Sequence, residues 1–191
     1  MDAASTVPAF MSHARAERRT ARELEEDART WGDASGANGL RCASIASAAF
    51  DELAKRAIDA RRKNRALDLP DDALEVLAWL HGESALRKAL ETLQGGRVRR
   101  VVAEGSGRAM YAVASSEGAD GDKRSYLCFP SHYCSCRSFF WECVSRGEAL
   151  ACKHQLAARL ASVLDAAQTT TVDDALLGNM MMKYFEGDAA M

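Results

Sequence analysis

Residues 132–154 read HYCSCRSFFWECVSRGEALACKH, and this stretch decides how the rest of the chain is interpreted. It contains two close pairs of potential metal ligands, Cys134-x-Cys136 and Cys152-x-His154, separated by fifteen residues. Three thiolates and one imidazole form a donor set that binds zinc tetrahedrally in structural sites. The spacing therefore predicts one structural Zn²⁺ held by these four residues.

Backbone geometry constrains how each pair can bind one ion. In an extended segment, residues i and i+2 point to the same side, so Cys134 and Cys136 can face the same ion if the chain curls. In a helix, residues i and i+2 point nearly opposite ways. We therefore expect Cys152 just before a helix and His154 in its first turn, and the sequence from 155 to 167 is helical in pattern. Buried or redox-active cysteines beside an unrelated histidine would explain neither the paired spacings nor this helix start.

Other cysteines and histidines near the cluster are spare candidates. Cys128, Cys143 and His132 belong to no close pair, and Cys143 is expected to pack inside the fifteen-residue insert. Four protein ligands leave no coordination position for water or substrate, which argues against metal catalysis. The sequence also has no phosphate-binding glycine loop, His-Glu-x-x-His motif or nucleophile elbow. These observations predict a binding module and not an enzyme.

The insert carries three consecutive aromatic residues, Phe139, Phe140 and Trp141. They could stack on nucleic-acid bases. A finger this small has little other apolar material, so we expect them to form its core. Tyr133 is the better candidate for an exposed contact.

Composition limits the classes of protein that the chain can represent. It has 191 residues, 48% of them hydrophobic, and its 25 basic and 27 acidic side chains leave a net charge of −2. This balance indicates no particular partner, and no apolar run approaches the roughly 18 residues of a membrane span. The N-terminus also lacks the apolar region of a signal peptide, so we expect a soluble, intracellular protein with no membrane partner. Because disulfides are rare in reducing compartments, five cysteines clustered between 128 and 152 indicate metal binding.

The apolar pattern predicts the organisation of the chain. Residues 1–40 are expected to be a flexible tail, and residues 41–191 a single α+β domain. Expected helices lie at 43–67, from Pro70 to 81, at 84–93 and at about 172–185. Three short antiparallel strands are expected at 98–102, 110–113 and 125–129, before a finger that occupies about 125–165 and runs into a helix. A tight hairpin is expected at 105–107 and an exposed loop at 117–124.

Charge is uneven along this domain. Residues 41–66 carry seven basic and three acidic side chains, and residues 67–96 carry two basic and six acidic ones. Residues 97–165 carry ten basic and seven acidic ones. We interpret this alternation as solvated faces more readily than as a nucleic-acid footprint.

The ligand pattern followed by a helix resembles the SWIM zinc finger. The sequence in and around this pattern narrows the set of SWIM proteins that the chain resembles. The segments that do so are HYCSC at 132–136 and LACKH at 150–154, together with LPDD at 69–72 and GSGR at 105–108. Over roughly residues 43–185 the chain is similar to the zinc finger SWIM domain-containing protein 7 family, the SWIM subunits of Shu complexes. Residues 1–40 and 117–124 lie outside that similarity.

The resemblance implies a nuclear role in homologous recombination and DNA repair. Members of this family pair with a RecA-like ATPase paralogue and help the strand-exchange recombinase assemble on single-stranded DNA. The resemblance places the zinc ligands at Cys134, Cys136, Cys152 and His154, and it assigns no partner-binding residues. The alternative is a standalone SWIM-finger module that binds DNA or protein. A ubiquitin ligase would need a second zinc cluster and a transposase a large acidic catalytic domain, and the chain offers neither.

Overall fold

The structure is a computed structural model that describes residues 41–63, 69–115 and 125–188. Its helices are α2 (Arg41–Arg62), α3 (Asp71–His81), α4 (Glu83–Gln94), the π-helix η2 (Phe139–Ser145), α5 (Lys153–Leu164) and α6 (Asp174–Asp188). Its strands are β1 (Val98–Ala103), β2 (Ala109–Ala114), β3 (Ser125–Phe129), β4 (Tyr133–Cys134) and β5 (Gln168–Val172). The predicted tail at 1–40 and the predicted loop at 117–124 lie outside the described residues. Within the described residues, no helix is both long and apolar enough to cross a bilayer.

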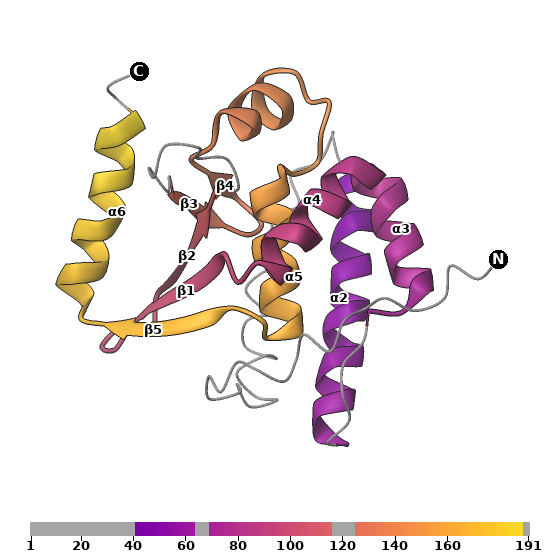
Figure 1. Cartoon of the computed structure of the whole chain (residues 1–191), viewed down its shortest axis with the longest axis horizontal. Helices are drawn as coiled ribbons and strands as arrows, with labels where there is room; N and C mark the ends of the chain where they lie inside the picture. Colours follow the sequence, from indigo (N-terminus) through magenta and orange to yellow (C-terminus); the bar gives the residue numbers. More distant parts are fainter. Residues whose placement is uncertain (1–40, 64–68, 116–124, 189–191) are drawn as a thin grey trace.

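Helices α2, α3 and α4 form a layer beside the sheet (Figure 1). Helix α2 buries Phe50, Leu53 and Ala57 along one stripe, as the three-to-four-residue spacing of its apolar residues predicts. Helix α3 follows Pro70, whose extended conformation (φ −71°, ψ 149°) precedes the first helical turn. Gly82 separates α3 from α4 because its φ of 82° is a conformation that few residues other than glycine adopt. The predicted helix start and break are both confirmed.

The sheet confirms the α+β class, but it is larger than expected and mixed. Its strand order is β4-β3-β2-β1-β5, with β5 parallel to β1 and all other pairs antiparallel. The expectation of about three antiparallel strands is therefore correct for β1 to β3 and incomplete for the sheet. Strand β5 reads QTTTV and is mostly exposed, so it has no apolar alternation to mark it. Strand β4 is only two residues long, too short for any periodicity.

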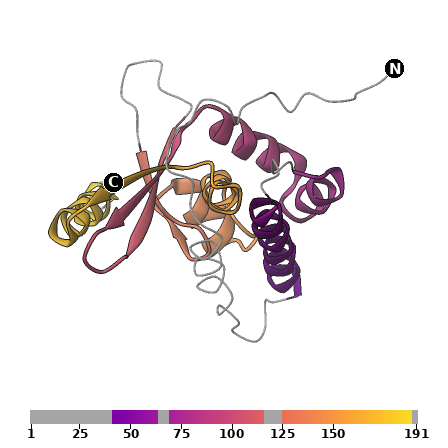
Figure 2. The same ribbon diagram turned by 90° about the horizontal axis from the view of Figure 1, so that it is seen from below.

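The two faces of the sheet support two separate cores. Val98 and Val113 belong to the larger core, which includes α2 to α5. Val101 and Met110 belong to a smaller core that Leu177 of α6 completes. Alternate residues of a strand point to opposite faces, so β1 and β2 contribute to both cores. Helices α5 and α6 accordingly lie on opposite sides of the sheet (Figures 1 and 2).

Polar contacts fix the ends of these helices. Asp165 ends α5 in the left-handed region (φ 53°), which aspartate tolerates, and its carboxylate accepts a 2.9 Å bond from Arg61 near the end of α2. Asp174, at the start of α6, accepts hydrogen bonds from the backbone N–H groups of Gly105 and Ser106 at 3.0 and 3.2 Å. The predicted hairpin at 105–107 is thus confirmed, and it also holds the first turn of the last helix.

Candidate metal centre

The first ligand pair lies where the chain leaves the sheet. Cys134 ends β4 and pairs with Cys128 of β3 across the antiparallel ladder. Ser135 then fixes the turn, because its N–H donates to the Leu127 carbonyl at 2.9 Å and its hydroxyl accepts from the Leu127 N–H at 3.0 Å. With Ser135 bound to β3, Cys134 and Cys136 both reach the same buried site. The chain therefore curls as a shared ion requires.

The second pair occupies the start of α5. Cys152 is the N-cap residue, with an extended backbone (φ −76°, ψ 165°), and the helix begins at Lys153. A capping box closes this end: the Gln155 N–H donates to the Cys152 sulfur at 3.5 Å, and the Gln155 side chain accepts from the Cys152 N–H at 3.3 Å. His154 is in the first turn. The expected placement of Cys152 before the helix and of His154 within its first turn is confirmed.

All four predicted ligands meet in one buried cluster. One donor atom from each of Cys134, Cys136, Cys152 and His154 lies within 4.8 Å of the other three. The side chains are 2 to 4% exposed. Cys134 Sγ lies 3.9 Å from His154 Nδ1, close to the separation of about 3.6 Å that a sulfur and a nitrogen have on a tetrahedral zinc ion. The donor set and its spacing therefore fit a metal ion, and Nδ1 is the imidazole nitrogen beside the Cys134 thiol.

The pKa values of the three ligand thiols are shifted in different directions because the thiols lie close together. Hydrogen bonds from Cys134 and Cys152 lower the pKa of Cys136. The pKa of Cys134 is raised, first by its hydrogen bond with Cys128, and the pKa of Cys152 is raised, first by its hydrogen bond with Cys134. Burial and the nearby thiols therefore oppose a negative charge on Cys134 and on Cys152. A divalent cation removes this opposition by stabilising all three thiolates together.

Residues around the ligands orient them. Tyr126 of β3 stacks on the His154 ring, with centroids 4.5 Å apart and planes 27° from parallel. The Phe139 N–H donates to Cys136 Sγ at 3.3 Å, which supports negative charge on that sulfur. The sequence reasoning did not identify Tyr126, because nothing in residues 125–129 marks a contact with a helix that begins 27 residues later. The only signal was the alternation of β3, which places Tyr126 and Cys128 on the same face.

The spare candidates do not join the cluster. Cys128 is buried beside Cys134, and burial raises the pKa of its thiol. Cys143, expected to pack inside the insert, is half-buried and packs against the larger core, and burial raises its pKa to about 11. His132 is exposed. Among the described residues, only the four predicted ligands form a group of three or more potential metal donors.

The insert aromatics differ from expectation. Phe139 is half-buried against the larger core, whereas Phe140 and Trp141 are 58% and 46% exposed, so core packing is the wrong prediction for both. A seven-residue helix presents only one side to the molecule, and consecutive residues cannot all face it. Tyr133 is half-buried, with ring centroids 5.7 Å from Phe139 and 5.8 Å from Phe185. The expected exposed contact at Tyr133 is therefore also wrong, because α6 returns beside that ring.

Comparisons with known proteins identify relatives that are named as zinc finger proteins. The mouse zinc finger SWIM domain-containing protein 7 is 34% identical over 116 residues, which cover 60% of this chain and 72% of the mouse protein. The human protein of the same name is 31% identical over 115 residues and 77% of its length, and the zebrafish protein is 34% identical over 119 residues and 80% of its length. No family model and no solved structure matches the chain. Identity at this level over most of the relatives' lengths shows that the chain belongs to the zinc finger SWIM domain-containing protein 7 family.

Proposed function

We propose that the cluster holds one structural Zn²⁺ through Cys134, Cys136, Cys152 and His154. Three thiolates and a neutral imidazole give the zinc site a net charge of −1, and the N-terminus of α5 favours an anion at this position. The ion joins the edge of the sheet to the helix at the centre of the larger core. With four protein ligands no coordination position stays open, so the metal stabilises the fold and does not carry out chemistry.

We further propose that the chain is a nuclear, non-enzymatic subunit of a Shu-type complex. In this role it promotes homologous recombination and DNA repair by supporting recombinase assembly on single-stranded DNA, together with a RecA-like ATPase paralogue. Membership of the family and the closed, buried ligand set carry the proposal. The absence of a phosphate-binding loop from the sequence agrees with an ATPase supplied by the partner.

The cations near the finger favour DNA contact through the complex over contact by this chain alone. Arg159 lies over the Phe50 ring at 4.2 Å and donates to the Ser47 hydroxyl at 3.3 Å, so it packs in the protein and does not face phosphate. Arg146 is exposed but lies 3.6 Å from Glu148. Arg137 is exposed and Lys153 is half-buried. Of these four described cations, one packs in the protein and one lies beside a carboxylate, which predicts weak binding to the phosphate backbone.

The exposed insert supports one alternative function. Phe140 and Trp141 lie edge to face, with centroids 5.9 Å apart, and both are open to solvent. Exposed aromatic rings can stack on bases of a single strand. A standalone DNA-binding finger is therefore the second candidate.

Co-expression with the RecA-like ATPase paralogue from the same genome tests the main proposal. We expect the two proteins to copurify in a fixed ratio and to bind single-stranded DNA more tightly than this chain does alone. Cys134→Ser should abolish copurification because it removes the metal-fixed surface, whereas Cys128→Ser should not. Tight binding by the isolated chain, weakening by about 0.7 log units per log unit of salt for each phosphate contact, would favour the standalone finger instead.

A further inference from the structure

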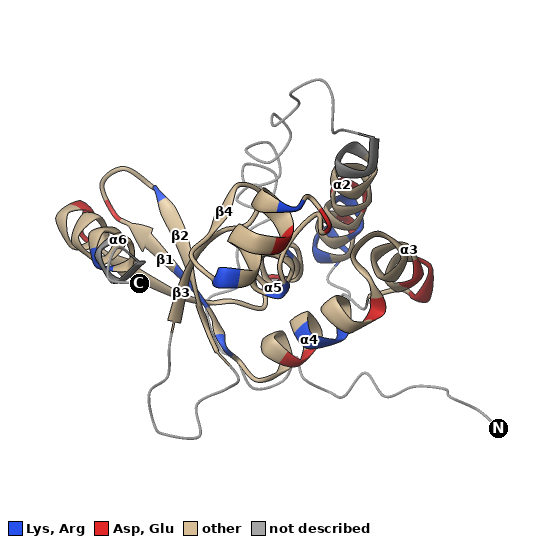
Figure 3. Cartoon of the chain, turned by 90° about the horizontal axis from the view of Figure 1, so that it is seen from above, with Lys and Arg blue, Asp and Glu red and all other residues tan. Residues whose placement is uncertain are grey.

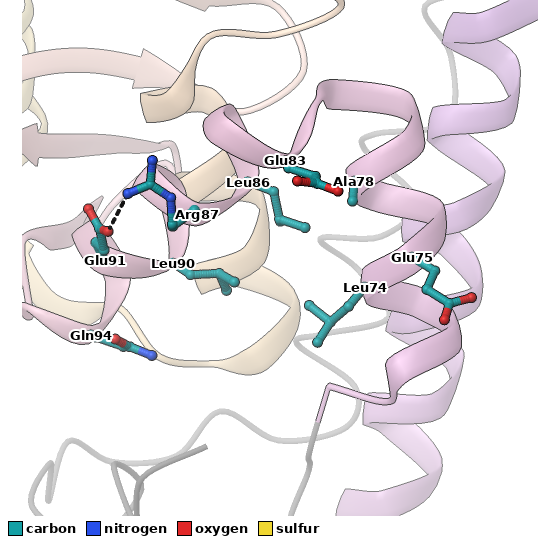
Figure 4. A pocket seen from close by; sticks show the side chains of 9 residues that line it. All are labelled: Leu74, Glu75, Ala78, Glu83, Leu86, Arg87, Leu90, Glu91 and Gln94. Atoms are coloured by element: carbon teal, nitrogen blue, oxygen red, sulfur yellow. Dashed lines mark hydrogen bonds and ion pairs between the residues drawn. The ribbon is translucent and has the colours of Figure 1, made fainter. Parts of the chain in front are cut away.

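A groove lies between α3 and α4, away from the ligand cluster in the chain and lined by different residues. Leu74 and Ala78 of α3 and Leu86 and Leu90 of α4 form its floor, and the cavity has a volume of about 540 Å³. Figure 4 shows Leu74, Leu86 and Leu90 projecting into the same space between the two helices. Only Leu86 is fully buried, and the other three are half-buried. The groove therefore presents apolar surface to solvent, in a volume typical of ligand and side-chain pockets.

Carboxylates surround this apolar floor. Glu75, Glu83 and Glu91 line the groove and are exposed, against a single lining cation, Arg87, which bonds to Glu91 at 3.2 Å. Acidic positions continue along α3 and stand on both sides of the basic residues of α4 (Figure 3). The segment from 67 to 96 is acidic as a whole, with six acidic and two basic side chains. The rim therefore attracts cations and repels phosphate.

Helix α3 also exposes two large apolar side chains that do not line the groove. Trp79 is 74% exposed, and Val76 is 42% exposed. Exposed tryptophan is enriched among the residues that contribute most to binding at protein interfaces. Two helices with an apolar floor and a charged rim fit an amphipathic helix, whose apolar residues at i, i+3 or i+4 and i+7 enter the groove.

The charges identify the kind of occupant. We propose that the α3–α4 groove binds a basic amphipathic helix of a partner protein, with its apolar residues on Leu74, Leu86 and Leu90 and its Lys or Arg side chains near Glu75 and Glu83. The chain's own segment 13–30 is a poorer match, because it contains several arginines but only one large aliphatic residue, Leu24. Nucleic acid is excluded by the sign of the rim. The proposal concerns a surface separate from the metal centre and holds whichever protein supplies the helix.

A matched pair of helical peptides tests this assignment with the full chain. Both peptides carry leucine at every third or fourth position; one has lysine at the flanking positions and the other has glutamate. Binding is measured by fluorescence anisotropy at low and at moderate salt. We expect the basic peptide to bind at least about tenfold more tightly than the acidic one, and to weaken as salt screens the rim. Equal binding of both peptides, or binding of neither, would overturn the proposal.

Variants locate the binding and control for net charge. The double variant Glu75→Lys with Glu83→Lys should weaken the basic peptide at least about tenfold. The control, Glu104→Lys with Glu148→Lys, makes the same charge change at exposed positions outside the groove and should leave affinity within about twofold. Equal losses in both double variants would show that only overall charge matters and would refute the site. A last variant replaces Arg15, Arg18, Arg19 and Arg22 by glutamate. If it bound the basic peptide about tenfold more tightly than wild type, the occupant of the groove would be the chain's own segment. That result would also refute the proposal.

Discussion

His81, at the end of α3, should make the stability of this protein depend on pH in a defined window. Neither of its ring nitrogens has a hydrogen-bond partner among the described residues, and its ring lies edge-on to Phe50 with centroids 6.2 Å apart. Burial, and then the charge of Arg159, lowers the pKa of His81 from 6.5 to about 4. His81 is half-buried, but its ring nitrogens are buried without a partner, and this favours the neutral imidazole.

The sign of the effect follows from which state binds the proton. Between pH 6.5 and about 4 the unfolded chain is protonated at His81 and the folded chain is not. This contribution to stability is therefore fully present above pH 6.5, is lost as pH falls through the window, and stays constant below about pH 4. From about pH 7.5 to about pH 5.5 the linkage relation gives a loss of about 1.3 kcal/mol. That range also avoids the stronger acid in which thiolates release metal.

The variant His81→Phe keeps an aromatic ring beside Phe50 and removes the titrating group. Urea unfolding at the two pH values should show wild type losing about 1 kcal/mol more stability than the variant. His132→Gln removes an exposed histidine and should follow wild type. Identical losses in wild type and His81→Phe would refute the reasoning, because they would show that His81 does not carry the pH dependence.

Four further substitutions separate packing from function. Leu160 is fully buried, so Leu160→Ala should lower the free energy of unfolding by about 3 kcal/mol while the folded protein keeps its full metal content, measured by denaturation and elemental analysis. Arg159→Met replaces the guanidinium over Phe50 with an apolar side chain. The slope of log affinity against log salt for single-stranded DNA binding by the partner complex should not change. A slope smaller by about 0.7 would show that Arg159 contacts phosphate. Phe140→Ala and Trp141→Ala should change stability by less than about 1 kcal/mol because both rings are exposed, and a larger loss by thermal unfolding would show that the insert is part of the core.

The candidate site could be predicted from sequence because its constraints are local. Cys134 and Cys136 are two residues apart. Cys152 and His154 lie at the start of a helix that the pattern of the following residues predicts. The neighbours that orient the ligands could not be predicted in this way. The stacking of Tyr126 on His154 and the contact of Cys128 with Cys134 depend on how β3 lies against α5 and β4, which is a tertiary property.

The elements of the fold also differ in whether local sequence predicts them. The apolar stripe of α2, the proline before α3 and the glycine between α3 and α4 specify their elements without reference to distant residues. Strand β5 forms because the edge of β1 is available, and its threonines give no burial signal. The exposure of the insert's aromatic rings could not be predicted for the same reason. A run such as Phe139-Phe140-Trp141 shows that apolar surface exists, but the direction of a seven-residue helix decides which of its rings are covered.

Zinc content per folded chain tests the central claim most directly. Elemental analysis of purified wild-type protein should find one zinc per chain, and Cys134→Ser and His154→Ala should both lose zinc together with thermal stability, because metal binding and folding are coupled. Cys128→Ser is the matched control, since Cys128 is as buried as the ligands and lies beside Cys134 but is not among the four residues of the cluster. It should keep one zinc per chain. Full zinc occupancy in both Cys134→Ser and His154→Ala, or an equal loss in Cys128→Ser, would contradict the assignment of this site.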